Sequence, residues 1–184
     1  MSRVKVIAIS GVSGCGKTTL VRKLSDEFEC PNLFFDDFVV HNTYPKNMKK
    51  WFENGARVSE IQTPKLVNAL SKLISSSDSQ YIFLEEPFGK GRDSISSLID
   101  YVILLDQPME ICLSRVIQRN AYNLTPDSLN SLSRYLLNYD DHFRDIYIET
   151  AKQVRGHCNL SIKDVISVQA CARLIGNWLR SNAK

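Results

Sequence analysis

The sequence predicts an α/β fold in which a parallel sheet is covered by helices on both faces. Apolar runs short enough for strands alternate along the 184-residue chain with segments of helical period. Such runs, without polar alternation, are typical of parallel strands buried on both faces. The expected strands cover 4–9, 31–35, 81–84, 98–106 and 157–162. We expect one domain over 1–184, with a ligand crevice at the carboxyl ends of its strands.

The first strand leads into Gly11-Val12-Ser13-Gly14-Cys15-Gly16-Lys17-Thr18, which fits the phosphate-loop pattern G-x-x-x-x-G-K-[ST] at every fixed position. Glycines let backbone N–H groups approach phosphate oxygens with no Cβ in the way. We expect Lys17 to reach the β- and γ-phosphates and the Thr18 hydroxyl to bind Mg²⁺. A helix follows, and its N-terminus favours an anion. A nucleoside triphosphate is therefore predicted to bind Gly11, Ser13, Gly14, Cys15, Gly16, Lys17, Thr18 and Thr19.

The composition is that of an ordinary globular protein, with 43% hydrophobic and 23% charged residues. A net charge of +3, with scattered basic residues, does not favour nucleic acid as a partner. No apolar run approaches the ~20 residues of a membrane helix. The five cysteines form no C-x-x-C pair and no signal peptide is expected, which favours the cytoplasm. A monomer and a homodimer both remain possible.

The second strand ends in Asp36-Asp37-Phe38, and the segment after it has no regular period. Residues 39–60 hold Tyr44, Lys49 and Trp51 among other polar and aromatic side chains. Two interpretations stay open for this excursion around 36–60: a substrate-binding segment, or a surface loop with a short helix near Trp51. A helix should then begin at Thr63-Pro64, where proline occupies its favoured first-turn position.

The third strand, 81–84, ends in Glu85-Glu86. An acid at the end of such a strand lies beside the phosphate loop and can orient Mg²⁺ and its water ligands. Strand alternation sends the two glutamates to opposite sides, and we favour Glu85 for the metal. The following Gly89-Lys90-Gly91-Arg92-Asp93 is interpreted as a flexible basic turn.

After the fourth strand, a helix opening near Pro108 carries Arg115 and Arg119 four residues apart on one face. These arginines belong either to a lid around 115–127 that closes over the phosphates or to a solvated basic face. A long amphipathic helix is expected from Pro126 to about Val154, with His142 at its surface. The fifth strand and a closing helix over 168–179 complete the chain.

The chain resembles the P-loop small-molecule kinases, and within them the uridine kinase and nicotinamide riboside kinase group. The resemblance covers most of the chain. It depends on the phosphate loop, on the Asp36-Asp37-Phe38 motif, and on the apolar strand that ends at Glu85. It also depends on the spaced run Pro108-x-Glu110-x-Cys112-x-x-Arg115-x-x-x-Arg119.

The resemblance implies a three-layer P-loop NTPase fold with a five-stranded parallel sheet, and ATP with Mg²⁺ as the phosphoryl donor. It further implies that Asp36 is the base acting on an acceptor hydroxyl and that a lid carries Arg115 and Arg119. We therefore expect catalytic roles for Lys17, Asp36, Arg115 and Arg119. We expect Thr18 and Glu85 to bind the metal. Besides Asp36, the expected substrate contacts are Asp37, Tyr44, Glu86 and Arg92.

Two departures from the group concern the acceptor side. Val39 replaces an aromatic residue, and Glu85 is followed by Glu86-Pro87-Phe88-Gly89 rather than the usual glycine-containing continuation. The acceptor is therefore expected to be a nucleoside or ribosyl compound, with another small metabolite as an alternative. A non-catalytic or regulatory nucleotide-binding protein is the other alternative. The guanine-specific segments N-K-x-D and D-x-x-G of GTPase switches are absent from the sequence.

Overall fold

The computed structural model describes residues 3–122 and 125–183, and it confirms the predicted α/β fold. Five strands form one sheet in the order β2-β3-β1-β4-β5, and each neighbouring pair is parallel. The strands are β1 (Lys5–Ser10), β2 (Asn32–Phe34), β3 (Tyr81–Glu85), β4 (Tyr101–Leu105) and β5 (Leu160–Ile162). The carboxyl ends of β2, β3 and β1 are therefore neighbours, so the segments that follow these three strands meet at one edge.

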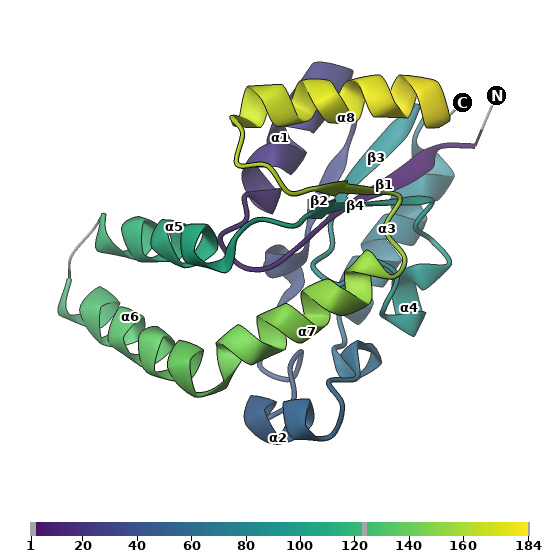
Figure 1. Cartoon of the computed structure of the whole chain (residues 1–184). Helices are drawn as coiled ribbons and strands as arrows, with labels where there is room; N and C mark the ends of the chain where they lie inside the picture. Colours follow the sequence, from purple (N-terminus) through teal and green to yellow (C-terminus); the bar gives the residue numbers. More distant parts are fainter. Residues whose placement is uncertain (1–2, 123–124, 184) are drawn as a thin grey trace.

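Helices cover both faces of the sheet in three layers (Figure 1). Helices α1 and α8 lie on one face, α3, α4 and α7 lie on the other, and α5 and α6 project beyond the end of β1. The helices are α1 (Lys17–Phe28), α2 (Met48–Glu53), α3 (Pro64–Ser76), α4 (Asp93–Ser96), α5 (Met109–Ala121), α6 (Pro126–Asn138), α7 (Arg144–Arg155) and α8 (Val168–Asn182). Short 3₁₀ turns cover Phe35–Phe38 and Val58–Glu60.

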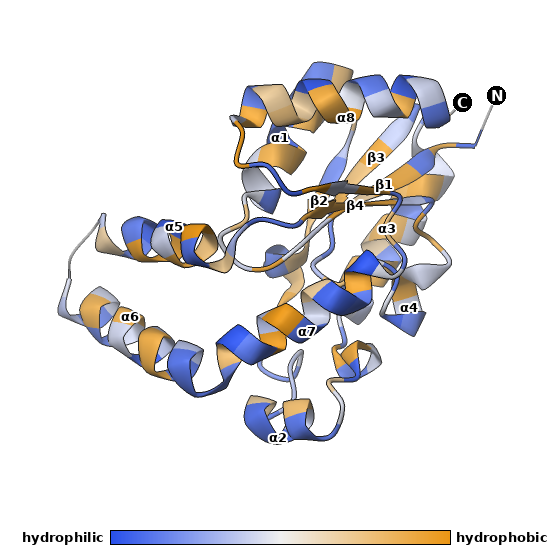
Figure 2. Ribbon diagram, viewed as in Figure 1, coloured by the Kyte–Doolittle hydropathy of each residue, from blue (hydrophilic) through white to orange (hydrophobic). Residues whose placement is uncertain are grey.

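Alternation along β1 divides the core into two halves. Ile7 and Ile9 pack in the cluster that contains α1 and α8 residues, whereas Val6 and Ala8 pack in the cluster beneath α3. All four side chains are completely buried, because helices cover both faces of the strand. Figure 2 shows the apolar strands between helices whose outer faces are polar. This double burial explains why the strands appear in the sequence as continuous apolar runs.

Three expected strands are shorter than the apolar runs suggested. The second covers Asn32–Phe34 rather than 31–35, because a 3₁₀ turn begins at Phe35. The fourth strand begins at Tyr101 rather than at residue 98, because α4 and a turn occupy the preceding residues. The fifth begins at Leu160 rather than at residue 157. Before it, Asn159 pairs with Val102: the Val102 N–H donates to Asn159 Oδ1 (2.8 Å), and the Asn159 N–H donates to the Val102 carbonyl (2.8 Å). The Asn159 side chain thus accepts the Val102 N–H in place of a backbone carbonyl of a neighbouring strand.

The long helix expected from Pro126 to Val154 is interrupted by a π-helical turn at Tyr139–Phe143. The i→i+5 hydrogen bonds of such a turn insert one residue and shift the apolar stripe between α6 and α7. Helix α7 buries Ile146 and Val154, but α6 has no buried residue, and Leu137 is 70% exposed. The apolar period of α6 therefore does not mark a core helix.

No helix in the described part of the chain combines the length and apolar character needed to cross a membrane.

Candidate active site

The phosphate loop follows β1 and has the backbone that its glycines allow. Gly11, Gly14 and Gly16 all have positive φ, at 136°, 82° and 104°. Gly14 also packs closely, since a Cβ built on it would lie 2.1 Å from the Cys112 carbonyl oxygen of α5. The buried Lys17 ammonium donates to the Val12 carbonyl across 2.9 Å, which places its charge over the loop. This cradle of N–H groups and one cation suits a polyphosphate.

The Thr18 hydroxyl donates to Glu85 Oε2 across 3.0 Å and so connects the start of α1 to the end of β3. Glu85 is only 3% exposed. Burial raises the pKa of the Glu85 carboxyl, while the Lys17 charge and the Thr18 hydrogen bond oppose that rise. Glu86 points to the other side of the strand, as alternation predicted.

The donor set fits the magnesium ion that the fold implies. Thr18 and Glu85 offer two hard oxygen ligands beside the loop, and Mg²⁺ usually takes one or two protein ligands together with phosphate oxygens and waters. Among the described residues, no cluster of three or more histidine, cysteine or acidic side chains could hold a metal. Any ion here would therefore depend on the phosphates for part of its coordination.

A cavity of about 360 Å³ opens beside the phosphate loop, and three charged side chains line it: Lys17, Asp36 and Glu85. Most of the remaining wall is aromatic or aliphatic, from Tyr44, Met48, Trp51, Ile61, Phe88, Phe143, Ile146 and Tyr147. The excursion after β2 supplies part of this wall and contains α2, the short helix expected near Trp51. Substrate binding by this segment stays a prediction. Desolvation and the nearby Asp36 charge raise the pKa of Tyr44 to about 12, so its phenol stays protonated. Asp37 is exposed and lies outside this lining.

Glu86 and Arg92, two of the expected substrate contacts, are fully buried and lie outside the cavity lining. They form an ion pair in which Arg92 Nε donates to Glu86 Oε1 (3.1 Å) and Arg92 Nη2 donates to Glu86 Oε2. Burial raises the pKa of the Glu86 carboxyl and the Arg92 charge opposes that rise. The interpretation of 89–93 as a flexible basic turn is wrong for Arg92, because its guanidinium is buried and held by Glu86, six residues earlier.

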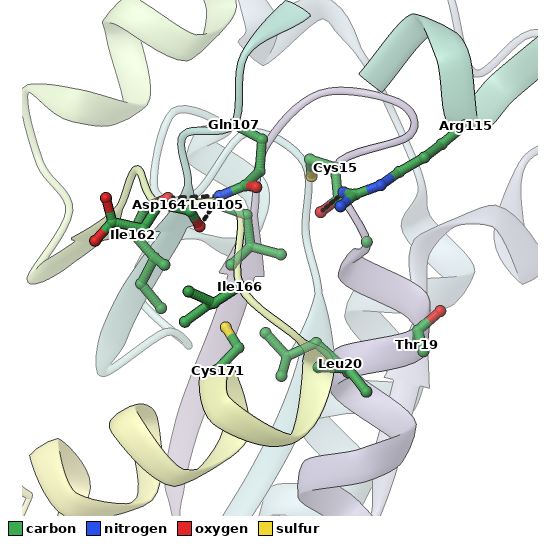
Figure 3. A pocket seen from close by; sticks show the side chains of 12 residues that line it. Cys15, Thr19, Leu20, Leu105, Gln107, Arg115, Ile162, Asp164, Ile166 and Cys171 are labelled. Carbon is green, nitrogen blue, oxygen red and sulfur yellow. Dashed lines mark hydrogen bonds between the residues drawn. The ribbon is translucent and has the colours of Figure 1, made fainter. Parts of the chain in front are cut away.

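A second cavity, of about 210 Å³, lies on the other side of the phosphate loop (Figure 3). Arg115 reaches from α5 toward the loop, and its Nη1 donates to the Cys15 carbonyl across 3.4 Å. Opposite it, the Gln107 amide donates to the carbonyls of Ile162 (3.1 Å) and Asp164 (3.0 Å) and so fixes the segment after β5. This arrangement offers room for a nucleotide base next to the phosphate cradle.

Sequence reasoning missed this second cavity. Its lining includes Gln107, Asp164 and Ile166, which carry no motif and come from two distant segments. The only local signal was position, since Gln107 directly follows a strand of the parallel sheet.

The lid expected over 115–127 includes 123 and 124, which lie outside the described residues. Arg115 lines the second cavity, as does Thr19 on α1, whereas Arg119 is exposed. The π turn at the far end of α6 contacts the excursion, because Lys49 Nζ on α2 pairs with Asp141 Oδ1 at 2.7 Å. His142 Nδ1 lies 2.9 Å from Asp141 Oδ2 in the same turn.

Solved structures share this fold across nearly the whole chain. TT1252 from Thermus thermophilus is 18% identical, with a TM-score of 0.59 over 98% of this chain and 99% of that one. Shikimate kinase from Aquifex aeolicus is 16% identical, with a TM-score of 0.51 over 97% and 98%. Shikimate kinase from Acinetobacter baumannii, solved with shikimate, is 18% identical, with a TM-score of 0.50 over 97% and 94%. At these identities the likeness shows the P-loop NTPase fold.

No curated protein matches the sequence. The family model described as an AAA domain matches residues 10–133, from the end of β1 through the phosphate loop to α6. The match covers more than half of the chain and includes the loop and both carboxylate segments that meet beside it. The chain therefore belongs to the AAA domain family of P-loop proteins.

Proposed function

We propose that this protein is an ATP- and Mg²⁺-dependent kinase that transfers the γ-phosphoryl group to a hydroxyl of a small molecule, a nucleoside or ribosyl compound. One observation carries the proposal: Lys17, Glu85 and Asp36, from three separate segments, line a single cavity beside the phosphate loop. A purely nucleotide-binding protein needs the loop and its cation, but it does not need a further carboxylate facing an aromatic cavity.

In the proposed reaction, the phosphate loop and Lys17 hold the β- and γ-phosphates and neutralise their charge. Thr18 and Glu85 would hold Mg²⁺, which supplies charge stabilisation on the transferring group. Asp36 accepts the proton of the acceptor hydroxyl, whose oxygen forms a bond to the γ-phosphorus as the bond to the β,γ-bridging oxygen breaks. ADP leaves with that oxygen. Arg115 and Arg119 are proposed to complete the charge clamp when the lid closes.

The walls of the larger cavity support an acceptor without negative charge. Of the described side chains that line it, Lys17 alone is cationic, and the phosphates would occupy that charge. The carboxylate of Asp36 also disfavours an anion there. Burying a carboxylate without a cationic partner is costly, whereas a ring-bearing alcohol can pack on Trp51 and Tyr147. These features favour a nucleoside over an acid such as the shikimate bound in the Acinetobacter enzyme.

The test is ADP release by purified protein with ATP and Mg²⁺, across panels of nucleosides, vitamin precursors, sugars and shikimate. We expect turnover with a nucleoside or ribosyl compound and no turnover with shikimate. Lys17→Ala is the inactive control, and its kcat should fall by orders of magnitude; a fall below ~10-fold would contradict its charge role. Tight ATP binding with no acceptor-dependent ADP release would favour the non-catalytic alternative, and turnover with another class of metabolite would change the acceptor alone.

A further inference from the structure

Arg92 forms a buried ion pair with Glu86, six residues earlier, and also contacts segments that are far apart in the chain. Besides its two bonds to Glu86, Arg92 Nη1 donates to the Ile61 carbonyl (3.1 Å) and to Thr63 Oγ1 (2.8 Å). Its Cζ also lies over the Phe35 ring, 5.1 Å from the centroid. A single buried guanidinium thus connects the end of β3, the end of the excursion and the turn after β2.

Two of these partners, Ile61 and Phe35, belong to the acceptor side of the site. Ile61 lines the larger cavity. Phe35 immediately precedes Asp36, and its ring packs against the rings of Phe88 (5.9 Å between centroids) and Tyr44 (6.3 Å), which line the same cavity. Displacement of the Arg92 guanidinium would therefore move three parts of the wall and the backbone next to Asp36.

The phosphate side is attached to the same strand end by different bonds. Ser10 Oγ donates to the Glu86 carbonyl (2.7 Å), and the Glu86 N–H donates to the Ile9 carbonyl (3.2 Å). These bonds use the backbone of Glu86 and do not need its carboxylate. A change in the side-chain pair should therefore affect the acceptor wall and leave the nucleotide cradle in place.

We propose that Arg92, held by Glu86, is a positioning residue that places the acceptor wall and Asp36 without touching either substrate. The proposal rests on the proposed kinase function. Arginine suits this role because its planar, forked guanidinium can make a bidentate bond to a carboxylate and still donate to other acceptors. Lysine has one compact ammonium and cannot span Glu86, Ile61 and Thr63 in the same geometry.

The main variant replaces the whole pair, as Glu86→Leu with Arg92→Met. Replacing both charges with apolar groups avoids an unpaired buried charge, so this double variant should fold. We expect its ADP affinity, measured by calorimetric titration, to match that of the wild type. Its kcat/KM for the acceptor should fall by ~10²-fold, since displacements near 1 Å are enough for such a loss. Arg92→Lys should give a smaller loss, and Thr63→Val, which keeps the ion pair, a smaller loss still.

Arg155→Met is the matched control. Arg155 also makes a bidentate pair, with Asp106 at 2.7 and 2.8 Å, but it is outside the lining of both cavities. We expect wild-type kinetics from this variant.

A merely structural role predicts a lower melting temperature with unchanged KM in the folded fraction. A folded double variant with wild-type acceptor KM and kcat would overturn the positioning role alone. A loss of ADP affinity as large as the loss of kcat/KM for the acceptor would overturn it too. If the double variant does not fold, unchanged kinetics in Arg92→Lys and Thr63→Val overturn it. A wild-type protein that turns over no acceptor overturns both this proposal and the kinase function.

Discussion

The Thr18 hydroxyl lies 3.0 Å from a carboxylate oxygen of Glu85, although the two residues are 67 positions apart in the chain. Their contact connects the first turn of α1 to the tip of β3 and places two oxygen atoms beside the phosphate loop, where we propose that Mg²⁺ binds. The Lys17 charge also acts on the Glu85 carboxyl, so the pair is tested with Lys17 left in place.

Thr18→Ala and Glu85→Gln should each weaken the apparent affinity for Mg²⁺ in turnover. A loss of 10–100-fold is expected, because each change removes one ligand or the group that orients it. The measurement is ADP release against free Mg²⁺ at saturating ATP, after metal removal with a chelator. Equal Mg²⁺ dependence in both variants and the wild type would place the metal elsewhere.

Asp36→Asn should reduce kcat by ~10²–10⁴-fold, because the amide cannot accept the proton of the acceptor hydroxyl. ATP affinity should stay unchanged, since Asp36 lines the acceptor cavity and is not part of the phosphate loop. Single-turnover assays and nucleotide titration separate the two effects. Asp26→Asn, at an exposed position on α1, is the control; normal turnover by Asp36→Asn would rule out the base assignment.

Gly14→Ala should destabilise the fold more than Gly16→Ala. Both positions have positive φ, so alanine carries strain of about 1–3 kcal/mol at each. Only at Gly14 would the new Cβ also meet a backbone atom, the Cys112 oxygen at 2.1 Å; nothing lies within 4 Å at Gly16. Urea denaturation of both variants gives the comparison. Equal losses would mean that α5 can move away from the loop without cost.

Arg115→Ala and Arg119→Ala should have different kinetic effects. Arg115 lines the smaller cavity and donates to the Cys15 carbonyl, so its loss should raise the KM for ATP by about tenfold. Arg119 is exposed in this conformation, so its loss should lower kcat and leave the KM for ATP nearly unchanged. Steady-state kinetics at varied ATP distinguish the two; a shared effect on KM would show that both arginines contact the ground-state nucleotide.

His157 should make stability depend on pH. Burial lowers its pKa below the ordinary 6.5, and its neutral Nε2 accepts the Lys90 N–H across 2.9 Å. Because the folded-state pKa is depressed, this contribution is fully present above pH 6.5 and is lost as pH falls through the folded-state pKa. Melting temperatures from pH 8 to pH 5 should fall more in the wild type than in His157→Gln. His41→Gln, at an exposed position, should keep the wild-type slope.

The phosphate loop, the alternation of strands with helices, and the acids at the ends of the second and third strands all follow from the sequence alone. Those features are local: a glycine pattern, an apolar run or a residue following a strand can be identified within ten residues. The meeting of the Asp36, Glu85 and Lys17 segments also followed, because the carboxyl ends of parallel strands share one edge.

The two cavities at that edge and the contacts of their walls depend on tertiary packing, which local sequence does not reveal. The contacts of Arg92 with Ile61 and Thr63 join segments 29 or more positions apart. The pairing of Arg92 with Glu86 spans only six positions, but neither it nor the cavity that includes Gln107 carries a motif. The exposure of α6 was equally hidden, because its apolar period is the same whether or not another element packs against it. Sequence patterns report which side chains can be buried, and the packing of distant segments determines which ones are.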